Sequence, residues 1–207
     1  MRNNGPKYVV VAALLVSVVA LSLGFAAFTS TLTISSEATV TGNSNAFNVQ
    51  LSKANNAFTS GSVTPTPTGT GTTGQNATIN AAGTTISGLK ATLGAKGANV
   101  KYSLYAYNSG SLLGYLNSVS FGTKTCTAKT GTTQSYVDAA CSKVTLTVKI
   151  GSNTYTSSNT NISSHTLAAG SAEAIEVTIA LASDAPDVDG DFDVAFGDVT
   201  ILYGSAD

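Results

Sequence analysis

Tryptophan is absent from this sequence, and histidine, methionine and cysteine are nearly so. The 207 residues include no Trp, one His, one Met and two Cys. General bases, nucleophiles and metal ligands are therefore scarce, and no zinc-protease, phosphate-loop or nucleophile-elbow motif occurs. The single histidine, His165, lies in SSHTLAAG before an expected strand, which is typical of a surface or turn residue. The sequence predicts a protein that is not an enzyme.

Charge is also scarce. Asp, Glu, Lys and Arg make up 10% of the chain, and the formal net charge is −1. Nucleic-acid binding normally requires a basic surface, so no nucleic-acid partner is predicted. The hydrophobic fraction of 43% relies on Ala and Val, and small and β-branched side chains suit a pleated sheet better than a helix. The composition indicates an all-β protein.

A hydrophobic segment opens the chain. Two basic residues precede Tyr8–Phe28, and no charge interrupts that run. It exceeds the usual signal core of ~7–15 residues and reaches the ~17–25 residues that span a bilayer. Two interpretations therefore stay open for residues 1–26: a cleaved signal helix or a retained N-terminal membrane anchor. The small residues favour a cut between Ala26 and Ala27, which predicts an exported protein that is secreted or held at the cell surface.

A strand-like segment follows the cut site directly, over residues 28–41. Its apolar face consists of Phe28, Leu32, Ile34, Ala38 and Val40. An alternating segment without a local partner tends to pair with an exposed sheet edge on another molecule. We interpret it as an assembly strand.

Alternation recurs through the rest of the chain. Apolar residues alternate with polar ones over 47–51, 100–106, 113–121, 144–150, 175–181 and 192–203. About seven strands with turns between them predict an immunoglobulin-like β-sandwich over residues 27–207. Gly197 shifts the phase of the last segment, which is typical of a β-bulge.

Two segments do not follow the alternation. Residues 59–85 are rich in Thr, Gly and Pro, and Pro65 and Pro67 lack backbone donors, so a loop is expected with Ile79 in a short edge strand. Residues 123–142 are interpreted as an insertion.

The two cysteines, Cys126 and Cys141, lie within this insertion. An exported chain meets an oxidising compartment, so we favour a disulfide between them over two free thiols. A closed loop of about 15 residues is expected to stabilise the fold by roughly 3 kcal/mol.

Four aspartates are spaced by two residues: Asp187, Asp189, Asp191 and Asp193. A bent segment could direct them at one Ca²⁺ ion, although no Glu closes an EF-hand loop. The alternative is a solvated turn. No other cofactor is expected.

Tyrosines gather in the strand predicted over 100–106. Tyr102, Tyr105 and Tyr107 lie within NVKYSLYAYNSGS. They suit either a sugar-stacking platform or packing on a strand face, and we favour packing.

Several stretches together resemble the TasA/camelysin family of exported matrix and fibre proteins. These are the signal ending GFA, the start Ala27-Phe28, GLKATL with VKYSLYAYNSGS, and the closing GDFDVAFGDVTILY. The resemblance implies a jelly-roll or immunoglobulin-like sandwich. It also implies biofilm-matrix fibres in which each copy donates its N-terminal strand to another copy or to a related matrix protein. The alternative is a monomeric cell-surface adhesin or carbohydrate-binding module.

Overall fold

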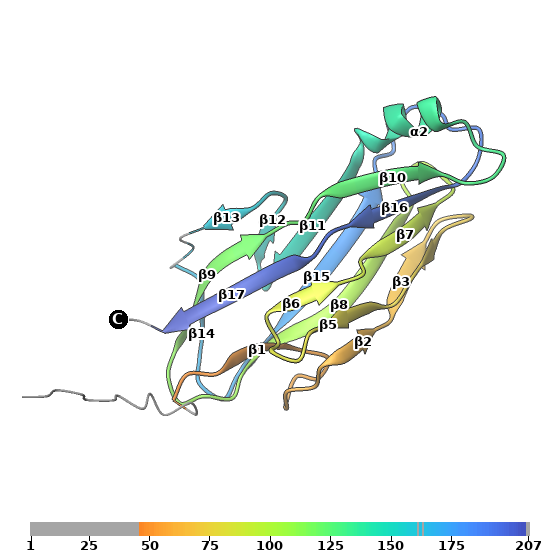
Figure 1. Ribbon diagram of the computed structural model, residues 1–207. Coiled ribbons are helices and arrows are strands. Elements are labelled where there is room, and N and C mark those ends of the chain that lie inside the picture. The colour runs from red at the N-terminus through yellow and green to blue at the C-terminus, as the bar shows by residue number, and fades with distance from the viewer. Residues whose placement is uncertain (1–45, 161, 163, 206–207) are drawn as a thin grey trace, which may run out of the picture. The chain divides into compact units, whose positions relative to one another are not determined.

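The computed structural model describes residues 46–160, 162 and 164–205, which form an all-β sandwich of two antiparallel layers (Figure 1). The signal segment 1–26, the expected cut between Ala26 and Ala27 and the assembly strand 28–41 lie outside the described residues. In the described part of the chain, no helix is both long and apolar enough to cross a membrane.

The first layer contains the longest strands. Its order is β1 (Val49–Ser52), β8 (Asn99–Asn108), β15 (Ala172–Leu181), β11 (Val144–Ile150) and β12 (Asn153–Tyr155), and β3 (Pro65–Thr68) also pairs with β8. The strands predicted over 100–106, 144–150 and 175–181 are β8, β11 and β15. Every second side chain of β11 is buried, as the alternation predicted, because successive side chains of a strand point to opposite faces.

The second layer consists of two sheets joined end to end. One has the order β10 (Lys124–Ala128), β16 (Phe192–Phe196), β7 (Lys90–Leu93) and β4 (Thr73–Gly74). The other has the order β13 (Asn159–Thr160), β9 (Gly114–Ser120), β17 (Val199–Ser205), β6 (Thr85–Ser87), β5 (Ala77–Ile79) and β2 (Gly61–Val63), and β14 (Thr166–Leu167) also pairs with β9. Four chain segments run through both: β4 to β5, β6 to β7, β9 to β10, and β16 to β17, the last three of which can be followed in Figure 1.

Glycines mark the level at which the two sheets meet. A Cβ atom on Gly122 would lie 2.3 Å from the backbone carbon of Gly197, so only glycine fits there. Ladder bonds continue across the break, since the Gly197 N–H donates to Thr123 O at 3.0 Å. The phase shift predicted at Gly197 is thus an interruption between β16 and β17, whereas the register shift within β17 lies between Leu202 and Tyr203.

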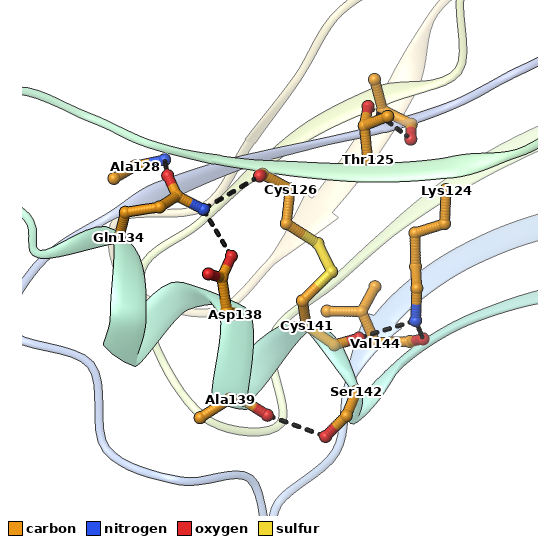
Figure 2. Close-up of a disulfide and its surroundings, with 11 residues drawn as sticks. Lys124, Thr125, Cys126, Ala128, Gln134, Asp138, Ala139, Cys141, Ser142 and Val144 are labelled. Atoms are coloured by element: carbon orange, nitrogen blue, oxygen red, sulfur yellow. Dashed lines mark hydrogen bonds between the residues drawn. A yellow bond between two sulfur atoms is a disulfide. The ribbon is translucent and has the colours of Figure 1, made fainter.

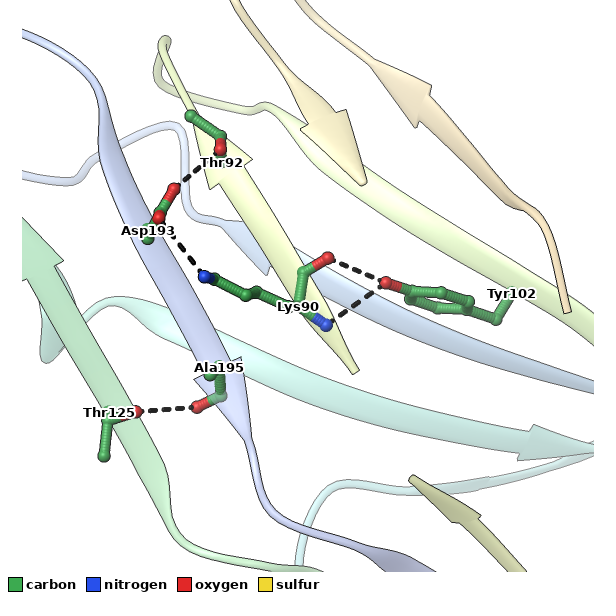
Figure 3. Close-up of polar contacts among 6 residues, drawn as sticks. All are labelled: Lys90, Thr92, Tyr102, Thr125, Asp193 and Ala195. Carbon is green, nitrogen blue, oxygen red and sulfur yellow. Dashed lines mark hydrogen bonds and ion pairs between the residues drawn. The ribbon is translucent and has the colours of Figure 1, made fainter. Parts of the chain in front are cut away.

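Tyr102 ties the two layers together across the core. It is 0% exposed, and its hydroxyl lies 2.9 Å from Lys90 O and accepts the Lys90 N–H at 3.3 Å (Figure 3). The same hydroxyl lies 3.0 Å from Gln75 O. Burial raises the pKa of this phenol. Because Lys90 opens β7, the bridge reaches the second layer close to its break.

Two segment predictions need correction. Residues 59–85 are not a loop: they contain β2, β3, β4 and β5, and Ile79 lies in the short strand β5, which is not the expected edge strand because it pairs with both β6 and β2. Residues 123–142 begin with β10, a strand of the second layer, and continue into the helix α2 (Gln134–Cys141). These strands have two to five residues each, too short for an alternating pattern to stand out.

Candidate functional site

The edges of the two layers are the candidate sites for assembly. An edge strand turns a row of backbone N–H and C=O groups away from its sheet, and another chain can pair with that row.

The edge formed by β1 and β3 is blocked within the described chain. Pro65 and Pro67 have no backbone N–H group. Within β3, only Thr66 and Thr68 can therefore donate backbone hydrogen bonds to β8, and the outer side of the strand has no N–H donor. The outer side of β1 is engaged as well, because Leu51 N–H donates to Gly83 O at 2.6 Å. Proline on an edge strand is a known obstacle to further pairing.

The edge of β10 is covered by a side-chain amide from α2. Gln134 Oε1 accepts the Ala128 N–H at 2.8 Å, and Gln134 Nε2 donates to Cys126 O at 3.3 Å (Figure 2). The same Nε2 donates to Asp138 Oδ1 at 2.7 Å, which holds the amide in this orientation. The amide thus occupies the place that a neighbouring strand would take.

A disulfide fixes α2 against β10. Cys126 in β10 and Cys141 at the end of α2 are bonded, with their Cα atoms 6.1 Å apart (Figure 2). The predicted pair is confirmed, and it suits an oxidising compartment. Because the disulfide joins β10 to the last residue of α2, it keeps the helix that carries Gln134 next to the edge of β10.

Lys124 connects the edge of β10 to the start of β11. Its Nζ donates to Cys141 O at 2.6 Å and to Val144 O at 2.8 Å (Figure 2). A cation at the carbonyl end of α2 is favourable for the helix dipole, and burial lowers the pKa of this ammonium. One lysine therefore occupies carbonyls at both the helix end and the first residue of β11.

The first half of β11 is an open edge. β12 pairs only with Val148–Ile150, whereas β15 pairs with β11 over its full length on the other side. Among residues 46–205 without 161 and 163, no strand pairs with the outer side of Val144–Thr147. The side chains of Val144 and Leu146 are buried, at 3% and 5% exposure, so the core behind this edge is already packed.

The aspartates predicted as calcium ligands have separate protein partners. Asp187 pairs with Lys96 at 2.8 Å, and Asp189 accepts the N–H of Thr133 at 2.9 Å and its hydroxyl at 2.6 Å. Hydrogen bonds from Thr133 lower the pKa of Asp189.

The other two aspartates lie further along the same segment. Asp193 accepts the Thr92 hydroxyl at 2.7 Å and lies 3.5 Å from Lys90 Nζ (Figure 3). The Asp191 carboxylate lies against Gly94, where a Cβ atom would be 2.7 Å from it. No group of three or more acidic, His or Cys side chains within the described ranges is placed to hold a metal ion. Calcium binding stays a prediction.

A polar cluster at the other end of the sandwich was not anticipated. His165 Nε2 lies 2.6 Å from Glu173 Oε2, and its Nδ1 lies 2.7 Å from Asn153 Nδ2. The His165 side chain is 9% exposed, so the expected turn position is right but a surface side chain is wrong. Burial and the nearby Glu173 carboxylate raise the pKa of Tyr155 and of Tyr203. We interpret the cluster as a polar closure of this end.

The chain was compared with protein-family models, with curated proteins and with solved structures, and none of the three gave a match.

Proposed function

We propose that this protein is an exported structural subunit of the cell surface or matrix. Copies assemble into fibres when residues 28–41 of one copy pair with the open edge of β11 in the next. The outer side of Val144–Thr147 carries this proposal: no strand of the described residues pairs with it, although Lys124 Nζ donates to the Val144 carbonyl at its start, and the core behind it is packed. The alternating strand 28–41, the disulfide and the resemblance to TasA/camelysin proteins support the same function.

The energetics suit strand addition. Each new backbone hydrogen bond contributes only ~1 kcal/mol. The apolar face of the added strand would bury further area at about 25 cal/mol per Å². Cutting the chain at Ala27 would release the strand from the membrane, so export and assembly would be coupled.

A truncation series tests the fibre itself. Electron microscopy compares chains that begin at Ala27 and at Gly42, with circular dichroism to verify that both contain folded sheet. We expect fibres only from the longer chain. Ile34→Asp, on the apolar face of the strand, should prevent fibres, whereas Thr33→Asp, on the other face, should permit them. Equal fibres from both chain lengths would refute strand donation, whereas no fibres from either would favour the monomeric adhesin or carbohydrate-binding module.

Mixed cross-linking tests the acceptor edge. Thr145→Cys places a thiol on the exposed face of β11, and Thr178→Cys on the neighbouring β15 is a matched control one strand further from the edge. Each is mixed with a chain carrying Thr31→Cys, Thr33→Cys or Thr39→Cys in the assembly strand. Intermolecular disulfides at 145 and not at 178 are expected. Fibres that form without any cross-link at 145 would place the acceptor on another edge.

A further inference from the structure

The outer face of the first layer contains a groove of about 310 Å³. It lies over β8, β15 and the end of β11, on the side of the layer away from the core. It is lined by Ser103, Tyr105, Lys149, Ala174 and Glu176 and by the backbone of Gly151. The buried Leu104 and Ile175 contribute to its floor. The edge of β11 before Val148 is not part of it.

The strand register explains the shape of this groove. Tyr105 lies opposite Ala174 in the β8–β15 ladder, and Tyr107 lies opposite Ala172. The methyl group of alanine is too short to cover a tyrosine ring, so each ring has a small neighbour on its β15 side. Since successive outward positions on a strand are about 7 Å apart, the tyrosine–alanine pairing repeats along the face.

Polar groups of both signs line the groove beside Tyr105, whereas Tyr107 lies next to the groove, two residues further along β8. Glu176 lies opposite Ser103 on one side and opposite Lys149 on the other. Its carboxylate pairs with Lys101 Nζ at 3.2 Å. Ammonium groups can donate to hydroxyls, and a carboxylate or a serine can accept from them. The nearly balanced charge disfavours a strongly ionic ligand.

The tyrosines thus divide into two kinds. Tyr102 points into the core and bridges the layers, as expected for packing. Tyr105 and Tyr107 are only half-buried on the opposite face of the same strand. Tyrosine offers a large, rigid and amphipathic contact surface at low cost in conformational entropy.

We propose that this groove binds a chain of a neutral polysaccharide. The apolar faces of its sugar rings would lie against Tyr105 and Tyr107, and its hydroxyls would bond with Lys149, Glu176 and Ser103. The repeated tyrosine–alanine pairing suits a ligand with a repeating ring. This binding function is separate from fibre formation and does not depend on it, because the groove and the open edge of β11 use different groups.

Affinity electrophoresis of the full exported protein tests the proposal. Native gels contain dextran, xylan or laminarin as neutral probes, and alginate as the acidic probe. We expect at least one neutral polysaccharide to retard the protein and alginate to leave it unretarded. Tyr105→Ala and Ala174→Leu, which remove the ring and fill the groove, should each weaken the apparent affinity by about tenfold or more.

Tyr136→Ala is the matched control. Tyr136 is 53% exposed and lies on α2, so its loss should leave retardation unchanged. Both groove substitutions replace outward-facing residues, and an unchanged melting temperature verifies their folding. The proposal is overturned if no neutral polysaccharide retards the wild type, if only alginate does, or if both groove variants bind like the wild type.

Discussion

Removing the disulfide gives the sharpest test of how α2 covers the edge of β10. Cys126→Ser with Cys141→Ser opens a loop whose cysteines are 15 residues apart. The chain-entropy relation then predicts a loss of roughly 3 kcal/mol in the free energy of unfolding. With a urea m-value of about 1–3 kcal/mol/M, the midpoint should fall by about 1–3 M. By the size scaling for domains of this length, the melting temperature should fall by about 6–12 °C.

Urea unfolding followed by circular dichroism measures this loss, and amide exchange locates it. The Ala128 N–H, held by Gln134, should exchange much faster in the double variant, whereas the Thr178 amide in the central strand β15 should change only with global stability. A loss below about 1 kcal/mol with unchanged Ala128 protection would refute the reasoning, since α2 would then hold its place without the bond.

Three further predictions concern the fold. Tyr102→Phe removes the hydroxyl that bonds Lys90 and Gln75 across the core and should lower the free energy of unfolding by about 1–3 kcal/mol in urea titrations, while Tyr136→Phe on the exposed face of α2 should change it little. Gly122→Ala forces a methyl group into the facing backbone and should cost about 1–3 kcal/mol or more, whereas Gly204→Ala, with no atom within 4 Å of the new Cβ, should be nearly neutral by the same assay. The pKa of Asp189 is lowered in the folded protein. Its ionised carboxylate therefore stabilises the fold above the unfolded pKa near 3.9, and this stabilisation is lost as the pH falls through the folded pKa. Asp189→Asn should make the melting temperature less dependent on pH below about 4, and an unchanged dependence would contradict this.

The long strands could be predicted because their burial alternates over seven or more residues. β8, β11 and β15 each present one apolar face to a single core, so apolar residues recur at every second position of these strands in the sequence. The cysteine pair was also predictable, because an exported chain is expected to meet an oxidising compartment and two cysteines allow only one internal pair.

The rest depends on contacts between distant residues. β3 and β4 are strands because β8 and β7 pair with them, although their own sequence reads as a turn-rich loop. The eight residues of α2 are held by tertiary contacts, since a helix of this length is not stable alone. The His165 side chain is largely buried where it meets Glu173 near the start of β15 and Asn153 in β12, eight and twelve residues away.

The glycine break in the second layer has a mechanical consequence. The ladders on its two sides are joined by few backbone bonds, so each half can open without unzipping the other. The half with β7, β10 and β16 contains the disulfide, and the half with β6, β9 and β17 lies beside the histidine cluster. The two halves of the second layer are thus expected to unfold as two cooperative units that both pack against the continuous first layer. The Tyr102 bridge should set how strongly the opening of one unit is coupled to the opening of the other.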